Sequence, residues 1–370
     1  MKAHEMRKLV IDALIYKKNK AFGYQEYLFN LLEYFYANES LFDFDEIIII
    51  CDIRQVHEFK KFIDVFKIIG LNASSKLNQL ICQNLIKQKL KLSSNDVILY
   101  TYNYSSLFRQ GIHVLVIHDL LYLRRKLLPK FLMRIQRRIF IPRSVKIADK
   151  IIAISNDTLQ DVIANFRISS GKIVKIYNYF NFDKYKYIST DQLLDSPFFL
   201  SVCSTAYHKN TILVFRAFEL FCLSNSVFHL VLVGSLGNSG SELREQYNKL
   251  DDTVKSRIHI FTNITNEQLA QIYQKANYYI SATLFEGLGM PIIEAMYFNI
   301  PVLLSNLSVC HEVSSDMGIY FNPLSVDDLL QKMQEVINEN MVVDTRDIVL
   351  EKYSEINTSH KYIELLNNIK

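Results

Sequence analysis

Two acidic residues flank a glycine-containing turn in the stretch EGLGMPIIEAM, which runs from Glu286 to Met296. Glu286 and Glu294 are eight positions apart, so one carboxylate would stand at a helix mouth and the other about two turns behind it on a similar face. Gly287 and Gly289 let the backbone approach a ligand closely. Free N–H groups at a helix start bind phosphate, whereas carboxylates repel phosphate and accept hydrogen bonds from hydroxyls. The residue types therefore indicate a ligand with both groups, such as a nucleotide sugar; the alternative is a helix start with one solvent-exposed and one capping Glu.

The elements around this stretch would place it at the edge of a parallel sheet. A strand-like run, Tyr278–Ala282, precedes it, and a second run, Ile300–Leu304, follows the helix. Strand, turn and helix start form half of a βαβ unit, and open parallel sheets bind ligands at the carboxyl ends of their strands. Pro291 suits the first turn of the helix.

Two further side chains with useful chemistry follow expected strands. His118, with Asp119 after it, comes directly after the apolar run Val114–Ile117. Lys209 lies in the loop after a strand expected at 197–202, where a cation can neutralise the charge that builds on a diphosphate leaving group. The alternatives are a histidine satisfied by a hydrogen bond in the core and an exposed loop lysine.

The stretch from Glu286 to Met296 resembles the signature of retaining nucleotide-sugar glycosyltransferases of the two-Rossmann architecture (GT-B), in particular glycosyltransferase family 4. The pattern of that family is Glu, seven residues, Glu. The resemblance implies that Glu294 holds the ribose hydroxyls of the nucleotide and that Glu286 lies against the transferred sugar. It also implies that the amides of Gly287, Leu288 and Gly289 lie near the sugar and the pyrophosphate.

Other segments resemble further motifs of this family. His118 stands where the family places a histidine beside the donor sugar, and Lys209 stands in its phosphate loop. In that loop His208 replaces the usual Arg, and Ser204 or Thr205 occupies the place of another Arg. The resemblance therefore implies His118, Glu286 and Lys209 as catalytic residues, with fewer cations on the phosphate than usual.

Two glycines are weaker matches to donor-binding turns. Gly23 follows the first expected strand, where the family carries a Gly-containing loop, and Gly234 lies in a Val-Gly-Ser turn that resembles a turn near the nucleotide. A plain turn is the alternative at Gly23. Ser155 ends another expected strand and would cap the helix after it.

Length and composition indicate a folded protein of two domains. The 370 residues exceed one typical core, and a hydrophobic content of 49% with 22% charged residues is that of a globular protein. Strand-like and helix-like runs alternate, which favours an α/β fold with parallel sheets. The resemblance implies an N-terminal, acceptor-binding domain at 1–185 with residues 351–370 packing back on it, and a nucleotide-sugar domain at 196–350. The expected strands are Leu9–Tyr16, Glu46–Ile53, Val97–Tyr102, His113–His118, Ile151–Ser155, Ile173–Tyr177, Pro197–Val202, Phe228–Val233, Ile258–Thr262, Tyr278–Ser281, Val302–Leu304 and Ile319–Phe321, with helices at Tyr24–Tyr36, Val56–Ile69 and Asn266–Ala276 and a helix-like end at Tyr353–Ile369.

The sequence points to a cytoplasmic protein without a metal or cofactor. The five Cys are scattered without metal-ligand spacing, which is typical of reduced thiols. No segment resembles a signal peptide, and the longest apolar runs are far shorter than a membrane span. The pair Asp251 and Asp252 resembles a surface loop more than a metal site. Lys209 and helix N-terminal amides would do the work of a metal on the pyrophosphate.

The net charge of +4 is unevenly distributed. Between Arg124 and Lys150 ten basic residues face a single acidic one, with Leu, Phe, Met and Ile interleaved at helical spacing. Such a segment can lie on an anionic membrane surface, or it can be a helix with one core face and one solvated basic face. No motif for nucleic acid accompanies the charge, so no nucleic acid partner is expected.

The expected function is transfer of a hexose, with retention, from a nucleoside diphosphate sugar to a glycan or polyprenyl-diphosphate-linked oligosaccharide in bacterial surface polysaccharide synthesis. The patterns at His118 and the Arg-poor loop look like mannosyltransferases, which favours GDP-mannose over a UDP-hexose. Peripheral attachment to the inner face of the cell membrane would suit such an acceptor. The alternatives are a hydrolase or epimerase of the same shape and a non-catalytic membrane-surface protein.

Overall fold

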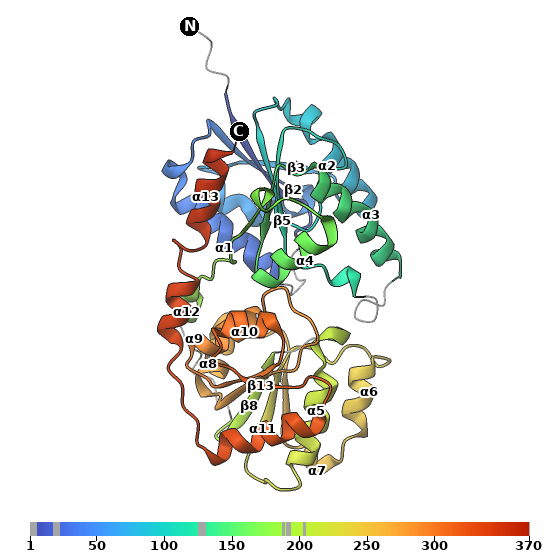
Figure 1. The fold of residues 1–370 in the computed structure, drawn as a ribbon, viewed down its shortest axis with the longest axis vertical. Helices are drawn as coiled ribbons and strands as arrows, with labels where there is room; N and C mark the ends of the chain where they lie inside the picture. Colours follow the sequence, from blue (N-terminus) through green and yellow to red (C-terminus); the bar gives the residue numbers. More distant parts are fainter. Residues whose placement is uncertain are drawn as a thin grey trace. The chain divides into compact units, whose positions relative to one another are not determined.

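The computed structural model describes residues 6–17, 23–124, 131–186, 189, 194–202 and 205–369. The chain forms two compact units, which are described one at a time (Figure 1). The first unit holds the described residues up to Phe180 and again from Tyr353; the second unit holds those from Asn181 to Lys352. The expectation of two Rossmann-like domains with parallel sheets is confirmed.

The described residues of the first unit form a seven-stranded parallel sheet in the order β3-β2-β1-β4-β5-β6-β7. Its central strands are runs of Val, Ile and Leu that are buried on both faces, as helices on both sides of a sheet require. The strands are β1 (Lys8–Ala13), β2 (Glu46–Asp52), β3 (Lys67–Leu71), β4 (Val97–Tyr100), β5 (Ile112–Ile117), β6 (Lys150–Ala153) and β7 (Ile173–Lys175). In this order β1 lies between β2 and β4, with Ile11 opposite both Ile49 and Leu99.

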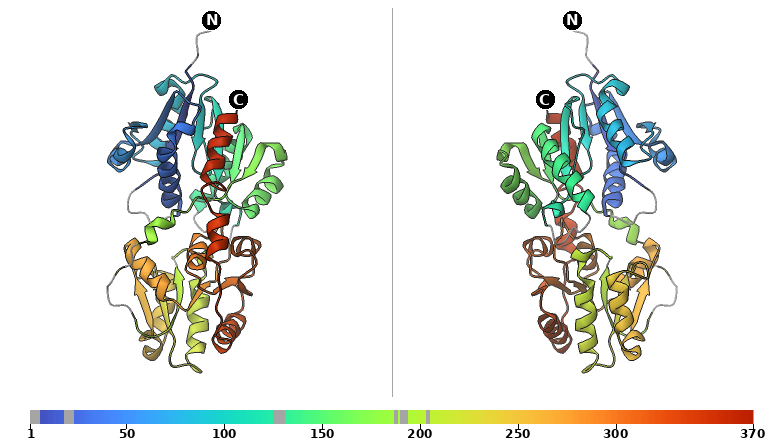
Figure 2. Two further views of the ribbon diagram at one scale, coloured as in Figure 1. Left: turned by 90° about the vertical axis from the view of Figure 1, so that its left-hand side faces the viewer. Right: turned by 90° about the vertical axis from the view of Figure 1, so that its right-hand side faces the viewer.

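Helices cover both faces of this sheet. The helices are α1 (Gly23–Ala37), α2 (Lys76–Leu90), α3 (Phe131–Ile147), α4 (Asn156–Phe166) and α13 (Ser359–Asn368), with short 3-10 segments η1 (Glu39–Leu41), η2 (Ile53–Phe62), η3 (Leu121–Leu123) and η4 (Ser170–Lys172). Figures 1 and 2 show α1 beside α13 on one face, and α2 and α3 on the other. The hydroxyls of Tyr27 on α1 and Tyr362 on α13 are 3.1 Å apart. The C-terminal helix therefore packs on the first unit.

One expected helix, Val56–Ile69, is wrong in its second half. The 3-10 segment η2 ends at Phe62, and Lys67–Leu71 forms the edge strand β3. Phe59 and Phe62 anchor η2 in the core. A Cβ on Gly70 would lie 2.7 Å from Val56 Cγ2, so β3 packs its backbone directly against η2. Such close backbone packing is a tertiary effect that helical periodicity does not reveal.

The described residues of the second unit form a six-stranded parallel sheet in the order β10-β9-β8-β11-β12-β13. Its strands are β8 (Phe198–Val202), β9 (His229–Val233), β10 (Ile258–Phe261), β11 (Tyr278–Ser281), β12 (Val302–Ser305) and β13 (Ile319–Phe321). The helices are α5 (Thr211–Phe221), α6 (Glu242–Lys249), α7 (Asp252–Lys255), α8 (Asn266–Lys275), α9 (Met290–Tyr297), α10 (Ser308–Ser314), α11 (Val326–Asn338) and α12 (Arg346–Lys352), with 3-10 segments η5 (Phe182–Tyr185) and η6 (Tyr207–Lys209). Phe199, Leu230, Ile280 and Leu303 are fully buried in its core.

The expected domain boundary at 185 differs from the observed division. Residues 181–185 pack with the second unit, because the ring of Phe182 stacks on that of Tyr297 at 4.3 Å between centroids. Among the described residues, no helix is long and apolar enough to cross a membrane.

Candidate functional site

The turn between β11 and α9 has the backbone conformation that its glycines permit. Gly289 is the N-cap of α9 and has a φ of 84°, in the left-handed region that favours glycine. A Cβ there would also lie 3.0 Å from Ile292 Cδ1. Gly287 is half-buried and Leu288 is buried in the same turn. The turn thus delivers the start of α9, with its free N–H groups, to the carboxyl end of β11.

Glu286 and Lys209 form an ion pair at this edge of the sheet. Lys209 Nζ lies 2.5 Å from Glu286 Oε1, and both side chains are mostly buried. The loops that carry them are joined, because Thr283 Oγ1 and the Leu284 N–H both donate to the carbonyl of His208. The structure therefore brings together three predicted site residues from the carboxyl ends of β8 and β11.

Glu294 lies on α9 and faces the interior of the unit, with only 5% of the residue exposed. The Tyr273 hydroxyl donates to its Oε2 at 2.7 Å, and Lys184 Nζ lies 3.3 Å from its Oε1. Burial and the charge of Glu294 raise the pKa of Tyr273 well above its usual value, so the phenol stays protonated and donates. Glu294 is therefore a buried carboxylate with a defined orientation.

The remaining predicted donor-binding positions of the second unit lie in the loops after β8 and β9. Gly234 follows β9 with a φ of 141°, and its N–H donates to the carbonyl of Phe261 at 2.8 Å. His208 is half-buried in η6, where its carbonyl joins the two loops. Thr205 is exposed and lies against the Gly237 turn, where a Cβ would come within 2.7 Å of Thr205 Cγ2. Ser204 lies outside the described residues.

In the first unit, His118 follows β5 at the carboxyl edge of the sheet. Its Nε2 lies 2.9 Å from the carbonyl oxygen of Thr101, which only accepts, so Nε2 carries the proton and Nδ1 is the accepting nitrogen of the neutral ring. Burial lowers the pKa of His118, which favours this neutral form. The rings of Tyr24 and Tyr27 meet the imidazole edge-on at 5.8 and 4.7 Å. Gly23, which precedes Tyr24, begins α1 at the same edge.

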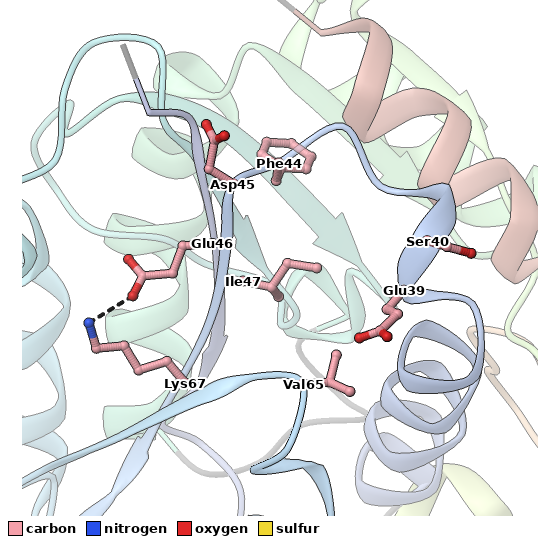
Figure 3. A pocket seen from close by; sticks show the side chains of 8 residues that line it. All are labelled: Glu39, Ser40, Phe44, Asp45, Glu46, Ile47, Val65 and Lys67. Carbon is pink, nitrogen blue, oxygen red and sulfur yellow. Dashed lines mark hydrogen bonds and ion pairs between the residues drawn. The ribbon is translucent and has the colours of Figure 1, made fainter. Parts of the chain in front are cut away.

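The pocket shown in Figure 3 lies in another part of the first unit. It encloses about 360 Å³ beside Glu46 and Lys67, which pair at 2.7 Å. These two residues begin β2 and β3, so the pocket is at the amino ends of the strands, opposite the edge that carries His118. Within the described ranges, no group of three or more His, Cys, Asp or Glu is placed to hold a metal ion. Metal independence stays a prediction.

Two residues at Glu294 were not among the predicted site residues. Lys184 lies at the end of the expected N-terminal domain at 1–185, and Tyr273 lies in the expected helix at 266–276. Neither stands near Glu294 in sequence, since 110 and 21 positions separate them from it. A buried carboxylate does imply a positive or hydrogen-bonding partner, but spacing does not say which one.

The two parallel-sheet units and their sites define a class of protein: the chain has the fold of the GT-B glycosyltransferases. Sucrose-phosphate synthase from Thermosynechococcus elongatus matches with a TM-score of 0.76 at 16% identity, covering 97% of this chain and 98% of that one. HepE from Anabaena, in its complex with UDP-glucose, matches with a TM-score of 0.73 at 14% identity, covering 99% of this chain and 100% of that one.

Residues 189–354, most of which lie in the second unit, match the family described as Glycosyl transferases group 1. Among the curated relatives, the O-antigen chain mannosyltransferase RfbU of Salmonella typhimurium (strain LT2) is 25% identical over 235 residues, which are 63% of this chain and 63% of the relative. The alignment thus spans less than two thirds of that relative. Membership of glycosyltransferase family 4 in particular stays a prediction.

Proposed function

We propose that this protein transfers a hexose from a nucleoside diphosphate sugar to a hydroxyl of a glycan or lipid-linked oligosaccharide. One observation carries the proposal: Lys209 pairs with Glu286 at the start of α9, and Glu294 is buried on the same helix. This arrangement offers a cation to a diphosphate and two carboxylates to the hydroxyls of a sugar and a ribose. The match of residues 189–354 to a glycosyl transferase family supports the same reading.

In the proposed reaction, charge builds on the nucleoside diphosphate as the glycosidic bond breaks. Lys209 and the N–H groups at the start of α9 stabilise that charge, so no metal ion is required. The acceptor hydroxyl attacks the face from which the nucleotide leaves, its proton passes to the β-phosphate oxygen, and the configuration at the anomeric carbon is retained. Glu286 accepts from a hydroxyl of the sugar.

For the donor, GDP-mannose is the proposal and a UDP-hexose is the alternative. A mannosyl donor is supported by the relative RfbU, which is an O-antigen chain mannosyltransferase. A UDP-hexose is supported by HepE, whose structure contains UDP-glucose. Incubation with each donor, followed by measurement of the released nucleoside diphosphate, distinguishes the two.

The acceptor of the proposed reaction is a polyprenyl-diphosphate-linked oligosaccharide, reached from an anionic membrane surface at the cytoplasmic face. Helix α3 carries exposed Ile135 and Ile139, at 39% and 60% exposure, and they lie among exposed basic residues that include Arg138 and Lys146. The mostly exposed Phe108 follows Leu107, whose carbonyl accepts a hydrogen bond from Arg143 on α3. Exposed apolar side chains among cations suit the headgroup region of an anionic bilayer. Residues 125–130 of the basic segment lie outside the described residues.

Product analysis separates this function from the other candidates. We expect wild type to release GDP from GDP-mannose chiefly when a lipid-linked oligosaccharide is present, and to form a longer oligosaccharide. A hydrolase would release mannose without an acceptor, and an epimerase would change the sugar without releasing GDP. A non-catalytic surface protein would keep its activity after Glu286→Ala and Lys209→Ala.

A further inference from the structure

Both carboxylate oxygens of Glu294 already have partners within the second unit. Oε2 accepts from the Tyr273 hydroxyl at 2.7 Å, and Oε1 lies 3.3 Å from the Lys184 ammonium. The hydroxyl of Tyr185 also lies beside Glu294, since burial and then the charge of Glu294 raise the pKa of Tyr185 well above its usual value. An ionised carboxylate offers about four acceptor positions, so the carboxylate still has room to accept from a ligand hydroxyl.

Lys184 compensates the charge of the buried Glu294 carboxylate. Glu294 is 5% exposed, and an ionised carboxylate buried to this extent is costly unless it is paired and hydrogen-bonded. Lys184 supplies the opposite charge, and its own side chain is only 16% exposed. The pair therefore places opposite charges side by side in this buried position.

The position of Lys184 is fixed by the aromatic residues on either side of it. Phe182 stacks on Tyr297 of α9, with ring centroids 4.3 Å apart and an interplanar angle of 10°. Tyr185 packs edge-on against Phe298 at 5.4 Å, and the Lys184 ammonium lies 4.6 Å from the centre of the Tyr185 ring. These contacts hold η5 against α9, so Lys184 is positioned before any ligand binds.

We propose that Lys184 and Tyr273 are positioning residues of the nucleotide site, which orient Glu294 so that its carboxylate accepts from the 2′ and 3′ hydroxyls of a ribose. The inference rests on the proposed function, and it assigns roles to two residues that the Glu-seven-Glu pattern does not contain. Neither residue touches the ribose itself. Each acts by fixing the direction of one carboxylate.

The test measures how strongly the protein distinguishes ribose from 2′-deoxyribose. Dissociation constants for GDP and 2′-deoxy-GDP, with UDP and 2′-deoxy-UDP in parallel, are measured by calorimetry for each variant. Wild type should bind the ribonucleotide about tenfold or more tightly than the deoxynucleotide, the size of a hydrogen bond to a charged group. Glu294→Gln should lower this ratio toward one.

Lys184→Met and Tyr273→Phe should lower the same ratio several-fold, and Lys184→Arg should restore most of it. Lys275→Met, an exposed lysine at the end of α8, is the matched control and should keep the wild-type ratio. Thermal unfolding of each variant verifies that it is folded.

Two outcomes would overturn the inference. If Lys184→Met and Tyr273→Phe weaken both nucleotides equally, so that the ratio is unchanged while Glu294→Gln lowers it, the two residues are merely structural and the proposed function stands. If folded wild type binds none of the four nucleotides, the proposed function fails together with the inference.

Discussion

Lys209 Nζ lies 2.5 Å from Glu286 Oε1, so the cation proposed for the diphosphate and the carboxylate proposed for the sugar neutralise each other before a donor binds. Because both side chains are mostly buried, each charged group is stabilised by the opposite charge of the other. In the proposed function the diphosphate of the donor competes for the lysine and frees the carboxylate to accept from a sugar hydroxyl. The pair would thus link diphosphate binding to sugar binding.

Removal of either member of this pair should reduce turnover strongly. Lys209→Met removes the charge proposed to stabilise the leaving group, and we expect kcat to fall by about 10²–10³, as for loss of one electrostatic stabiliser of a transition state. Glu286→Gln should have an effect of similar size. Lys249→Met, an exposed lysine on α6, is the control and should leave kcat unchanged. A Lys209→Met enzyme that keeps more than a third of the wild-type kcat would contradict the assignment of this lysine.

Much of the fold could be predicted from the sequence because its strands are short, buried and apolar. The expected strands Tyr278–Ser281 and Ile319–Phe321 agree with β11 and β13 residue for residue, and most others differ by one to three residues at an end. Ser155 caps α4 as expected, since it accepts from the Thr158 N–H at 3.1 Å. By contrast, α2 (Lys76–Leu90) was not among the expected helices. Its buried residues include the polar side chains Gln79 and Gln83, so the helix does not show a purely apolar buried face in the sequence.

The candidate site likewise contains some residues that the sequence indicates and others that only the fold reveals. Glu286 and Lys209 follow strands and Glu294 lies within α9, so pattern and loop position were enough to propose them. Lys184 and Tyr273 are distant from Glu294 in sequence, and only folding brings them to its carboxylate. What sequence reasoning misses here is therefore the set of residues that contact the buried carboxylate.

The stability of the first unit should depend on pH through Asp12. Burial raises the pKa of Asp12 from 3.8 to about 6. Because the folded-state pKa is the higher one, this group contributes stability that is fully present below about pH 4 and is lost as the pH rises through about 6. Above pH 7 its ionisation should cost up to about 3 kcal/mol in the free energy of unfolding.

Asp12→Asn removes this cost, and its amide can reach Gln83, whose Oε1 accepts no hydrogen bond from the described residues. We expect the variant to be more stable than wild type at pH 8 and the difference to disappear near pH 4, as measured by urea unfolding. Asp252→Asn, at a fully exposed carboxylate, should show no such dependence. An equal stability difference for Asp12→Asn at both pH values would be inconsistent with a raised pKa.

Binding to anionic vesicles should depend on the exposed face of α3. The double substitution Arg138→Gln with Lys146→Gln removes two charges, each worth about 1 kcal/mol near an anionic surface, so we expect about tenfold weaker binding or more. Ile135→Ser with Ile139→Ser should weaken binding by loss of apolar contact. Cosedimentation with phosphatidylcholine vesicles, with and without phosphatidylglycerol, measures both effects.

The control for this face is Arg216→Gln, which removes an exposed charge from α5 in the second unit. It should bind vesicles as wild type does. If all variants bind equally, or if wild type binds neutral vesicles as well as anionic ones, α3 has no role at a membrane surface and its basic residues are only solvated.

The most direct measurement of the central claim is a thermal-shift panel of nucleotide sugars on wild type and Glu294→Ala. The panel contains GDP-mannose, UDP-glucose, UDP-galactose, UDP-N-acetyl sugars and GDP-fucose, and Glu242→Ala, at an exposed carboxylate on α6, is the matched control. A donor at about 100 times its dissociation constant should stabilise the fold by about 2.7 kcal/mol. We expect GDP-mannose to raise the unfolding temperature of wild type and of Glu242→Ala, but not that of Glu294→Ala. If no nucleotide sugar raises the unfolding temperature of wild type, or if Glu294→Ala responds as wild type does, the proposed donor site is contradicted.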